Sequence, residues 1–247
     1  MRAASCAAFL VALAACGASA RMTIPRSQGI AVGTIKLYLS NVHVAIGEHP
    51  MLVDTGTHGD LHDLDAGLVE LGIDWHDIKC AVVTHAHSDH AGLARALQGR
   101  GIRIVAGRRD LDRMQKGDRG TLHPTSWKGV LLKPFIPSDF MPFTPDYIVD
   151  DQLDLRAPCG VDAVAIAMPG HTPGSLVVLA AGGRVAFVGD LFRGALTSAT
   201  EPMEHFYQDD LAAVHAHIRE LLDRGVVWFV LGHGGPAYRD DVARAFR

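Results

Sequence analysis

The strongest chemical signal in the sequence is a segment that places three histidines and an aspartate within six positions. It runs from His85 to His90 as His-Ala-His-Ser-Asp-His, after a strand-like run that ends at Thr84. Imidazole and carboxylate groups are ligands for Zn²⁺ and also for Fe, Mn or Co. His85 and His87 project to one side of an extended segment, whereas Asp89 and His90 begin a helix and point elsewhere. The segment therefore predicts ligands for two metal ions.

One turn cannot complete two metal sites, so further ligands must come from distant loops. Three candidates each follow a strand-like run: His171 in Pro-Gly-His-Thr-Pro-Gly, Asp190 in Phe-Val-Gly-Asp, and His233 in Leu-Gly-His-Gly-Gly. The neighbouring glycines permit tight turns that bring a ligand to the edge of a sheet. Each residue alone is a weak signal, but three at corresponding strand ends predict a shared site.

The elements that must position these residues form a single domain over residues 21–247. Runs of apolar residues predict strands at residues 35–39, 42–46, 51–53, 78–84, 102–106, 161–167, 176–180, 185–188 and 226–231. Helical spacing predicts helices at residues 61–71, 88–97 and 208–224, with a short one at the C-terminus. Strands, helices, strands and helices follow one another, which indicates two β-sheets packed together under outer helices.

The segment from Gly117 to Asp150 differs in character from the rest of the chain. It holds five prolines together with large apolar side chains, namely Trp127, Phe135, Phe140, Met141 and Phe143. Repeated prolines exclude a long regular element, because each removes a backbone donor and restricts its predecessor. We expect either a lid or substrate wall, or a loop that merely covers the core.

The first twenty residues predict an export signal rather than a part of the fold. Arg2 precedes an apolar run, and Ala18-Ser19-Ala20 is a cleavage sequence. A competing interpretation is a lipoprotein signal over residues 1–15, which would leave Cys16 lipidated. Both place the protein outside the cytoplasm, periplasmic or secreted; a cytosolic protein with an apolar N-terminus is the plain alternative.

Two cysteines, Cys80 and Cys159, remain beyond the predicted signal. Cys80 lies in an apolar strand-like run, where a buried free thiol is the usual explanation. A disulfide between the two is compatible with an oxidising compartment. The sequence does not supply the Cα separation that this pairing requires.

The composition excludes several functional classes. The 247 residues are 48% hydrophobic and 20% charged, an ordinary globular balance, with a net charge of −4. Lysines and arginines are scattered, which opposes a nucleic-acid partner. No phosphate-binding loop, G-x-S-x-G serine elbow or dinucleotide fingerprint is present. We expect a small-molecule substrate, with membrane contact only through a lipid anchor on Cys16; the oligomeric state is not predicted.

The order of the candidate ligands resembles the metallo-β-lactamase-fold superfamily over nearly the whole mature chain. The resemblance implies an α+β fold, an αββα sandwich of two mixed β-sheets with outer helices and the metals at one edge. It implies one ion held by His85, His87 and His171, a second held by Asp89, His90 and His233, and Asp190 bridging both. Asp54 matches an early aspartate that supports the site without being a ligand.

Departures within the superfamily narrow this resemblance. True β-lactamases of this fold carry cysteine or serine where this chain has Asp190, and flavodiiron-type members carry glutamate in place of His87. The complete set resembles glyoxalase-II-like thioesterases, lactonases and phosphodiesterases. Only residues 234–247 follow His233, which leaves no room for the C-terminal segment that helps to hold glutathione in glyoxalase II. Persulfide dioxygenases, which use a single iron, share much of the motif.

We therefore expect a metal-dependent hydrolase with two Zn²⁺ ions, Fe or Mn being alternatives. A metal-bound hydroxide would attack a small ester, lactone or thioester, while the catalytic carboxylates Asp89 and Asp190 neutralise the ions and aim the water. The apolar segment from Trp127 to Phe143 favours such substrates over phosphodiesters, although Lys128, Lys133 and Arg193 are available to a phosphate. A phosphodiesterase, a mononuclear iron persulfide dioxygenase, a β-lactamase and a non-catalytic metal-binding protein are the alternatives.

The remaining histidines predict no ligand. His215 and His217 form a second His-x-His pair, but on a helix residues two apart point about 200° away from each other. The others are expected at the surface or in packing: His43, His49, His58, His62, His76, His123 and His205. Of these, His58 and His205 are the two that could approach the mouth of the site.

Overall fold

The computed structural model describes residues 19–27, 30–47 and 49–246. Residues 1–18, with Cys16 and most of the predicted export signal, lie outside the described residues, so the signal and the lipid anchor stay predictions. Ser19 and Ala20, at the predicted cleavage sequence, are the first residues of strand β1 (Ser19–Ser27). Within the described ranges, no helix has the length and apolar character needed to cross a bilayer.

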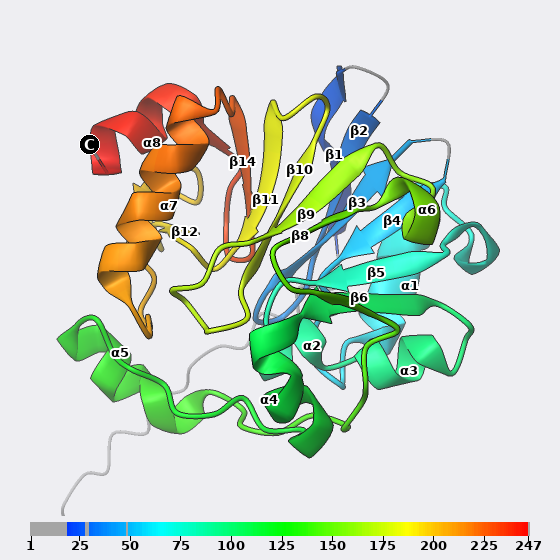
Figure 1. The fold of residues 1–247 in the computed structure, drawn as a ribbon, viewed down its shortest axis with the longest axis horizontal. Coiled ribbons are helices and arrows are strands. Elements are labelled where there is room, and N and C mark those ends of the chain that lie inside the picture. The colour runs from blue at the N-terminus through cyan, green and yellow to red at the C-terminus, as the bar shows by residue number, and fades with distance from the viewer. Residues whose placement is uncertain (1–18, 28–29, 48, 247) are drawn as a thin grey trace, which may run out of the picture.

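Two mixed β-sheets form the centre of the molecule (Figure 1). Over the described residues the first sheet has seven strands in chain order: β1, β2 (Ile30–Lys36), β3 (Asn41–Ile46), β4 (Pro50–Val53), β5 (Cys80–Val83), β6 (Arg103–Gly107) and β7 (Tyr147–Val149). Pairing is antiparallel from β1 to β4 and parallel from β4 to β7.

The second sheet has the order β15-β14-β11-β10-β9-β8. Its strands are β8 (Gln152–Asp154), β9 (Ala163–Ala167), β10 (Leu176–Ala180), β11 (Val185–Gly189), β14 (Trp228–Leu231) and β15 (Ala237–Tyr238). β11 and β14 pair in parallel, and the other neighbours pair antiparallel. A separate two-stranded ribbon joins β12 (Arg193–Gly194) to β13 (Pro202–Met203).

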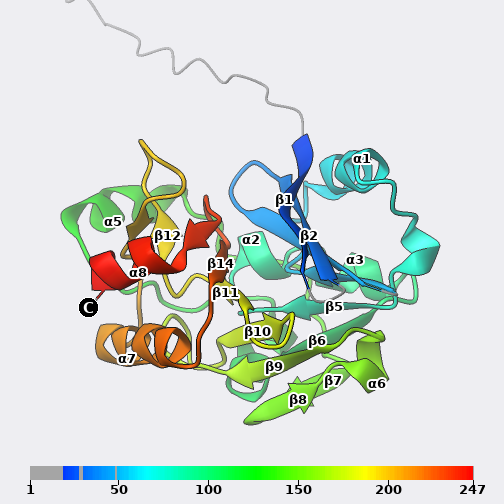
Figure 2. The ribbon, with the colours of Figure 1, turned by 90° about the horizontal axis from the view of Figure 1, so that it is seen from above.

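Helices cover the outer faces of both sheets (Figure 2). The described helices are α1 (Leu61–Glu70), α2 (Ser88–Ala91), α3 (Ala94–Gln98), α4 (Leu111–Lys116), α5 (Trp127–Leu132), α6 (Arg156–Cys159), α7 (Leu211–Asp223) and α8 (Arg239–Phe246). Two of them do not cover an outer face: α6 packs Cys159 between the sheets, and α5 is exposed except at Gly129. One buried apolar cluster fills the space between the sheets. A second joins the first sheet to α1 and α3, and a third joins the second sheet to α7 and α8. These layers confirm the αββα sandwich expected from the sequence.

Helix α7 shows how the apolar spacing specifies an outer helix. Asp210 caps its start, because the side chain accepts a hydrogen bond from Ala213 N at 2.9 Å. Val214 and Ile218 are buried on the face toward the second sheet. Gly225 follows the helix at φ +87°, a left-handed conformation that favours glycine.

The helix predicted over residues 88–97 is instead two short helices, α2 and α3. The break comes at Gly92, whose N–H donates to Gly56 O at 2.9 Å. A Cβ at Gly92 would lie 2.5 Å from Ser88 O and 2.6 Å from Gly56 O. The helix is therefore interrupted because the chain packs directly against the loop that follows β4.

The proline-rich segment 117–150 contains no long regular element, as expected. It holds α5, a 3₁₀ turn at Lys133–Phe135 and, at its end, β7. Phe140 and Phe143 pack into the core beneath the first sheet, whereas Trp127 and Phe135 are exposed. The large aromatic side chains of this segment therefore divide between core and solvent.

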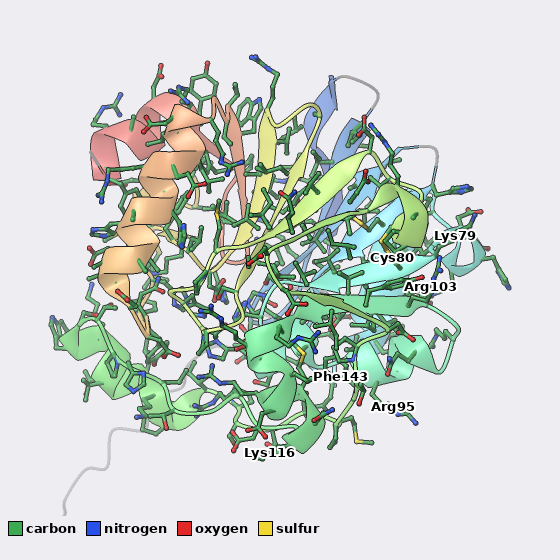
Figure 3. The ribbon with its side chains drawn as sticks, viewed as in Figure 1. Lys79, Cys80, Arg95, Arg103, Lys116 and Phe143 are labelled. Atoms are coloured by element: carbon green, nitrogen blue, oxygen red, sulfur yellow. A yellow bond between two sulfur atoms is a disulfide. The ribbon has the colours of Figure 1, made fainter. Side chains whose placement is uncertain are left out.

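Cys80 and Cys159 form a disulfide, with their Cα atoms 5.2 Å apart. Cys80 lies on β5 and Cys159 ends α6, which packs beside that strand (Figure 3). The expectation of a buried free thiol at Cys80 is wrong. The sequence could not supply the reason, because the two cysteines are 79 positions apart and meet only through the packing of the sheets.

Candidate metal centre

The candidate ligands lie at one edge of the sandwich because the strands that precede them end there. β11 and β14 are parallel neighbours, and β9 runs in the same direction as β11. The carboxyl ends of strands that run in one direction meet at a common edge. In the first sheet, Thr84 directly follows β5, and its carbonyl accepts from Leu176 N of the second sheet at 2.8 Å. This bond joins the two sheets beside the histidine segment.

The first group of candidate ligands is His85, His87, His171 and Asp190, all buried. His171 Nε2 lies 3.2 Å from His85 Nε2 and 3.0 Å from His87 Nδ1. Asp190 Oδ2 lies 3.8 Å from His85 Nε2 and 3.6 Å from His171 Nε2. Three imidazole nitrogens and one carboxylate oxygen thus converge on one point.

The second group is Asp89, His90 and His233. His233 Nε2 lies 3.5 Å from His90 Nε2 and 3.4 Å from Asp89 Oδ2. Asp190 Oδ2 is also close to this group, at 3.5 Å from His90 Nε2 and 3.2 Å from His233 Nε2. A single carboxylate oxygen therefore lies between both groups, which is the position expected for a bridging ligand.

The spacing of these atoms fits divalent metal ions. Ligands about 2.1 Å from a tetrahedral ion lie about 3.4 Å from one another. The observed separations of 3.0 to 3.8 Å bracket that value. In addition, Asp190 Oδ1 is buried without a hydrogen-bond partner among the described residues. A buried carboxylate with an unsatisfied oxygen is costly unless a cation or donor balances it, so the site favours metal ions.

Hydrogen bonds at the far nitrogens orient the rings. His90 Nδ1 lies 2.8 Å from Asp54 Oδ2, His171 Nδ1 lies 2.9 Å from Tyr207 O, and His233 Nδ1 lies 2.8 Å from Leu39 O. An acceptor at Nδ1 places the proton there and leaves the Nε2 lone pair free. Such partners fix the tautomer of metal-binding histidines and raise their basicity.

Asp54 has the supporting position that the resemblance implied. One of its carboxylate oxygens accepts from Thr84 N at 2.8 Å, and the other lies beside His90. Asp54 adopts φ 67°, a left-handed conformation that costs a non-glycine residue about 1–3 kcal/mol. The strained backbone directs this carboxylate under His90 and away from the cavity.

The electrostatics divide the histidines into two kinds. Burial, together with neighbouring imidazoles, holds the pKa of His85 and His87 well below the usual value. At His90 and His233 burial also acts to lower the pKa, but nearby carboxylates outweigh it and raise the pKa. His85 and His87 therefore present neutral nitrogens, as metal binding requires. Around His90 and His233 the carboxylates produce a negative potential that attracts cations.

The pKa of Asp190 follows from the same field. Its burial acts to raise the pKa, but the facing imidazoles of His233, His90 and His205 outweigh this and hold the pKa well below the usual value. Asp190 is therefore an anion in the centre of the histidine cluster.

Sequence reasoning missed Asp110, which connects the loops that carry two of the ligands. Its carboxylate is fully buried and accepts from Ala86 N at 2.9 Å, Thr172 Oγ1 at 2.7 Å and Gly174 N at 2.9 Å. Ala86 separates His85 from His87, and Thr172 follows His171. Asp110 lies in an ordinary Arg-Arg-Asp-Leu sequence, so no local signal distinguished it.

His205 has a larger role than the sequence indicated, whereas His58 does not. His205 is buried, and its Nε2 lies 3.2 Å from Asp190 Oδ2. With Asp190 and His233 it forms a third group of atoms able to hold an ion. Burial lowers the pKa of His205 to about 3. His58 is exposed and belongs to none of the ligand groups found among the described residues.

Two glycines are required where the chain passes the site. Gly189 adopts φ 50°, and a Cβ there would lie 2.7 Å from Thr84 Oγ1. A Cβ at Gly232 would lie 2.4 Å from Asp190 Oδ1. Any side chain at either position would displace the carboxylate or the strand end that holds it.

A cavity of about 420 Å³ opens onto Asp89, Asp190 and His233. Its remaining wall is mainly apolar, built by Leu37, Leu39, Leu122, Leu132, Ile136, Leu196 and Phe206. The proline-rich segment supplies three of these side chains, all aliphatic. The segment therefore forms part of the cavity wall, one of the two interpretations that the sequence left open, whereas Trp127 and Phe135 are exposed and Phe140 and Phe143 are buried in the core.

A family model for the metallo-beta-lactamase superfamily matches residues 37–233, well over half of the chain. Those residues include Asp54 and all seven candidate ligands. A comparison with curated proteins finds no match.

Solved structures of the same fold superpose on this chain. A mutant metallo-beta-lactamase from Cronobacter sakazakii is 23% identical, with coverage of 87% of this chain and 79% of that one and a TM-score of 0.57. A metallo-beta-lactamase family protein from Thermus thermophilus is 21% identical, with coverage of 87% and 77% and a TM-score of 0.62. BJP-1, a subclass B3 metallo-beta-lactamase of Bradyrhizobium japonicum, is 20% identical, with coverage of 87% and 77% and a TM-score of 0.60. At these identities the likeness concerns the fold alone.

Proposed function

The chain belongs to the metallo-beta-lactamase superfamily, and from this premise we propose that it is a metal-dependent hydrolase with two Zn²⁺ ions that cleaves a small ester, lactone or thioester. The observation that carries the proposal is the position of Asp190 Oδ2 between two groups of imidazoles. His85, His87 and His171 would hold one ion, and Asp89, His90 and His233 the other. Fe or Mn would suit the same donors.

When bound, such ions supply Lewis acidity and lower the pKa of a water molecule toward about 7. The protein contributes the arrangement around that chemistry. Asp190 and Asp89 would place negative charge beside the cations and would accept hydrogen bonds from water. Asp54 and the carbonyl of Tyr207 keep the rings of His90 and His171 in the orientation that aims Nε2 at the site.

The cavity supports a substrate that is partly apolar. Leucine side chains and Phe206 surround the opening beside Asp89 and Asp190. Apolar walls exclude water from the reacting group and strengthen the electrostatic interactions within the site. An acyl chain next to an ester, lactone or thioester carbonyl would pack against these apolar side chains.

A substrate panel tests the proposal. The purified protein, loaded with zinc and in a parallel sample with iron, is assayed against a lactone, a thioester, a carboxylic ester, a phosphodiester and a persulfide. We expect turnover of at least one acyl substrate, its loss on treatment with a chelator and its return on adding zinc. Turnover of the phosphodiester alone, or oxygen consumption with the persulfide and one equivalent of iron, would replace the proposal with one of the alternatives. Protein that holds its metals yet is inert to all five would favour a non-catalytic role.

β-Lactam hydrolysis is a second candidate, because solved structures that share the fold are themselves metallo-beta-lactamases. The aspartate at position 190 disfavours it by the resemblance described above. A chromogenic cephalosporin added to the panel separates the two, since only a β-lactamase would hydrolyse it at a rate comparable with the best acyl substrate.

Export to the periplasm or the exterior remains our proposal for the location. The Cys80–Cys159 disulfide supports it, because disulfides persist in oxidising compartments. Fractionation of the native host with detection of the mature N-terminus tests it. Cleavage at Ala20 would support a soluble exported form, lipid on Cys16 would support the anchored form, and intact Met1 in the cytosol would contradict both.

A further inference from the structure

Arg193 is a buried arginine at the wall of the cavity that the metal centre shares. It begins β12, three residues after Asp190, and lines the same cavity as Asp190, His205 and His233. Only 6% of the residue is exposed. The charged group therefore lies inside the substrate cavity and not on the outer surface.

The guanidinium is positioned by its neighbours but forms no ion pair with any residue that the structure describes. Its Nη1 donates to Gly194 O at 2.7 Å, and its Cζ lies 3.8 Å from the centre of the Phe206 ring. Its Nε is buried with no hydrogen-bond partner among the described residues. Burial alone lowers the pKa of Arg193, with no carboxylate acting in the opposite direction.

Arg113, the other arginine with a buried unpaired nitrogen among the described residues, has carboxylates beside it, at 3.1 Å to Asp209 and 4.0 Å to Asp110. Arg103 donates to Tyr147 Oη at 2.9 Å and to Pro158 O, and Arg239 donates to the carbonyls of Leu222 and Val226. A guanidinium stays protonated even when buried, so an unpaired one is expensive to desolvate. Because Arg193 lines the cavity beside the metal centre, we expect the ligand to supply the anionic partner of its guanidinium.

We propose that Arg193 binds a carboxylate of the substrate, so that the enzyme acts on acyl compounds that carry a free carboxylate on an apolar chain. The identity of the cleaved bond rests on the proposed function above, whereas the anion site does not. Stacking on Phe206 fixes the plane of the guanidinium, and a guanidinium held in this way offers a carboxylate donors of defined direction as well as charge.

Charge and shape favour a carboxylate over a phosphate. Apart from the proposed metal ions, Arg193 is the one buried Lys or Arg side chain on the described cavity wall, so it balances a monoanion at that end of the substrate, whereas a phosphate dianion there would need a second cation. Lys36, the other cation on the cavity wall, is exposed to solvent. Leu37, Leu39 and Leu196 provide apolar surface for the chain between the carboxylate and the reacting carbonyl.

Matched substrates test this recognition by kinetics. A glutaryl thioester with a free ω-carboxylate is compared with its ω-methyl ester in wild-type protein, Arg193→Gln, Arg193→Lys and Lys36→Gln. We expect Arg193→Gln to lower kcat/KM for the free acid about 10- to 100-fold, the loss typical of one contact to a charged group. The methyl ester should change by less than about threefold, because it lacks the charge that the contact recognises.

The other two variants sharpen the kinetic result. Arg193→Lys keeps the charge but loses the planar fork, so it should fall between wild type and Arg193→Gln. It also keeps the test valid if Arg193→Gln does not fold, which thermal unfolding of each variant would reveal. Lys36→Gln should affect the free acid less than either change at Arg193, because water screens an exposed charge. Equal losses for acid and ester, or a larger loss in Lys36→Gln, would overturn the proposal.

A binding measurement separates this proposal from the proposed reaction. The metal-loaded protein is titrated by calorimetry with hexane-1-sulfonate, which coordinates metals weakly, and with hexanoate, hexyl phosphate and hexan-1-ol. We expect both monoanions to bind wild type at least about tenfold more tightly than Arg193→Gln. If no substrate turns over but this difference holds, the anion site stands and the hydrolase proposal fails. Equal binding to both proteins, or a loss of affinity on Arg193→Gln that is more than about tenfold larger for hexyl phosphate than for hexanoate, overturns the carboxylate assignment.

Discussion

Two His-x-His pairs in this chain show how much the backbone decides about a sequence pattern. His85 and His87 follow β5 in an extended segment, are buried, and have ring centres 4.6 Å apart. His215 and His217 lie on α7 and turn to different carboxylates, Nε2 of His215 lying 3.1 Å from Glu204 and Nδ1 of His217 lying 3.4 Å from Glu220. The same spacing therefore produces convergent ligands in one place and two separate surface groups in the other.

The difference also concerns what surrounds each pair. The imidazoles of the first pair are buried and face His171 and Asp190, an arrangement of nitrogens and a carboxylate that could hold a cation. The imidazoles of the second pair are half-buried at the surface, where water and a nearby glutamate satisfy them. A ligand pattern predicts a metal only where the backbone brings lone pairs together and burial removes the alternative partners.

The largest expected effect comes from removing the anion between the two groups. Asp190→Ala should lower kcat/KM by at least about a thousandfold. Metal ions stabilise the charge of the transition state by several kcal/mol, and Asp190 lies between the two groups of residues that would hold them. Steady-state kinetics with the best panel substrate measure the loss, and circular dichroism checks the fold. Wild-type turnover in this variant would remove Asp190 from the mechanism.

The two pairs can be compared directly by single substitutions. His87→Ala should weaken zinc binding by more than about 100-fold, beyond the range of about 10- to 100-fold known for supporting partners. His217→Ala, its counterpart on α7, should leave zinc affinity unchanged. Competition with a chromophoric chelator provides both affinities. Similar zinc affinities for His87→Ala and His217→Ala would contradict the claim that only the first His-x-His pair supplies metal ligands.

His43 tests what burial does to an imidazole outside the ligand set. It lies between Thr34 Oγ1 and Leu231 O, and burial lowers its pKa from 6.5 to about 4. Because the unfolded chain binds this proton first, stability should be complete above pH 6.5 and fall by about 3 kcal/mol as the pH drops toward 4.

Urea unfolding of wild type and His43→Gln at pH 7 and pH 4.5 isolates this contribution. The variant is expected to be less stable at pH 7, but its stability should fall less steeply with acid. Since metal loss affects both proteins, it cancels in the difference. Parallel pH profiles would show that His43 is not the buried neutral group described here.

A smaller effect is expected from the carboxylate behind His90. Asp54→Asn keeps the shape but removes the charge, and it should weaken zinc binding about 10- to 100-fold. Asp65→Asn is the matched control, because Asp65 also accepts a side-chain hydrogen bond, from Trp75 Nε1 at 2.7 Å, but far from the site. An equal effect of the two substitutions would mean that Asp54 supports the local backbone and not the metal.

Much of the fold and of the candidate site follows from local sequence signals. The apolar runs located the strands of four or more residues from β3 onward, and the spacing in residues 208–224 located α7. The two longest strands were not located: β1 was not predicted, and the run at 35–39 overlaps β2 only at Ile35 and Lys36. The seven candidate ligands are recognisable because each follows a strand-like run, and the structure brings them together; their ligation stays a prediction. The sandwich could be expected because strand and helix blocks alternate along the chain.

What the sequence could not provide depends on contacts between distant segments. Predicting the break between α2 and α3 at Gly92 would require knowing that Gly56 packs against it. Asp110 and His205 carry no motif, and their roles appear only when three loops meet. The Cys80–Cys159 pairing and the unpaired state of Arg193 are likewise products of packing.

The central claim is that seven side chains converge on two metal ions, and anomalous diffraction from crystals grown with zinc tests it most directly. We predict two peaks at the zinc edge, one among His85, His87 and His171 and one among Asp89, His90 and His233, with Asp190 between them. A crystal with no zinc peak at either group, although the protein is folded, would contradict the account.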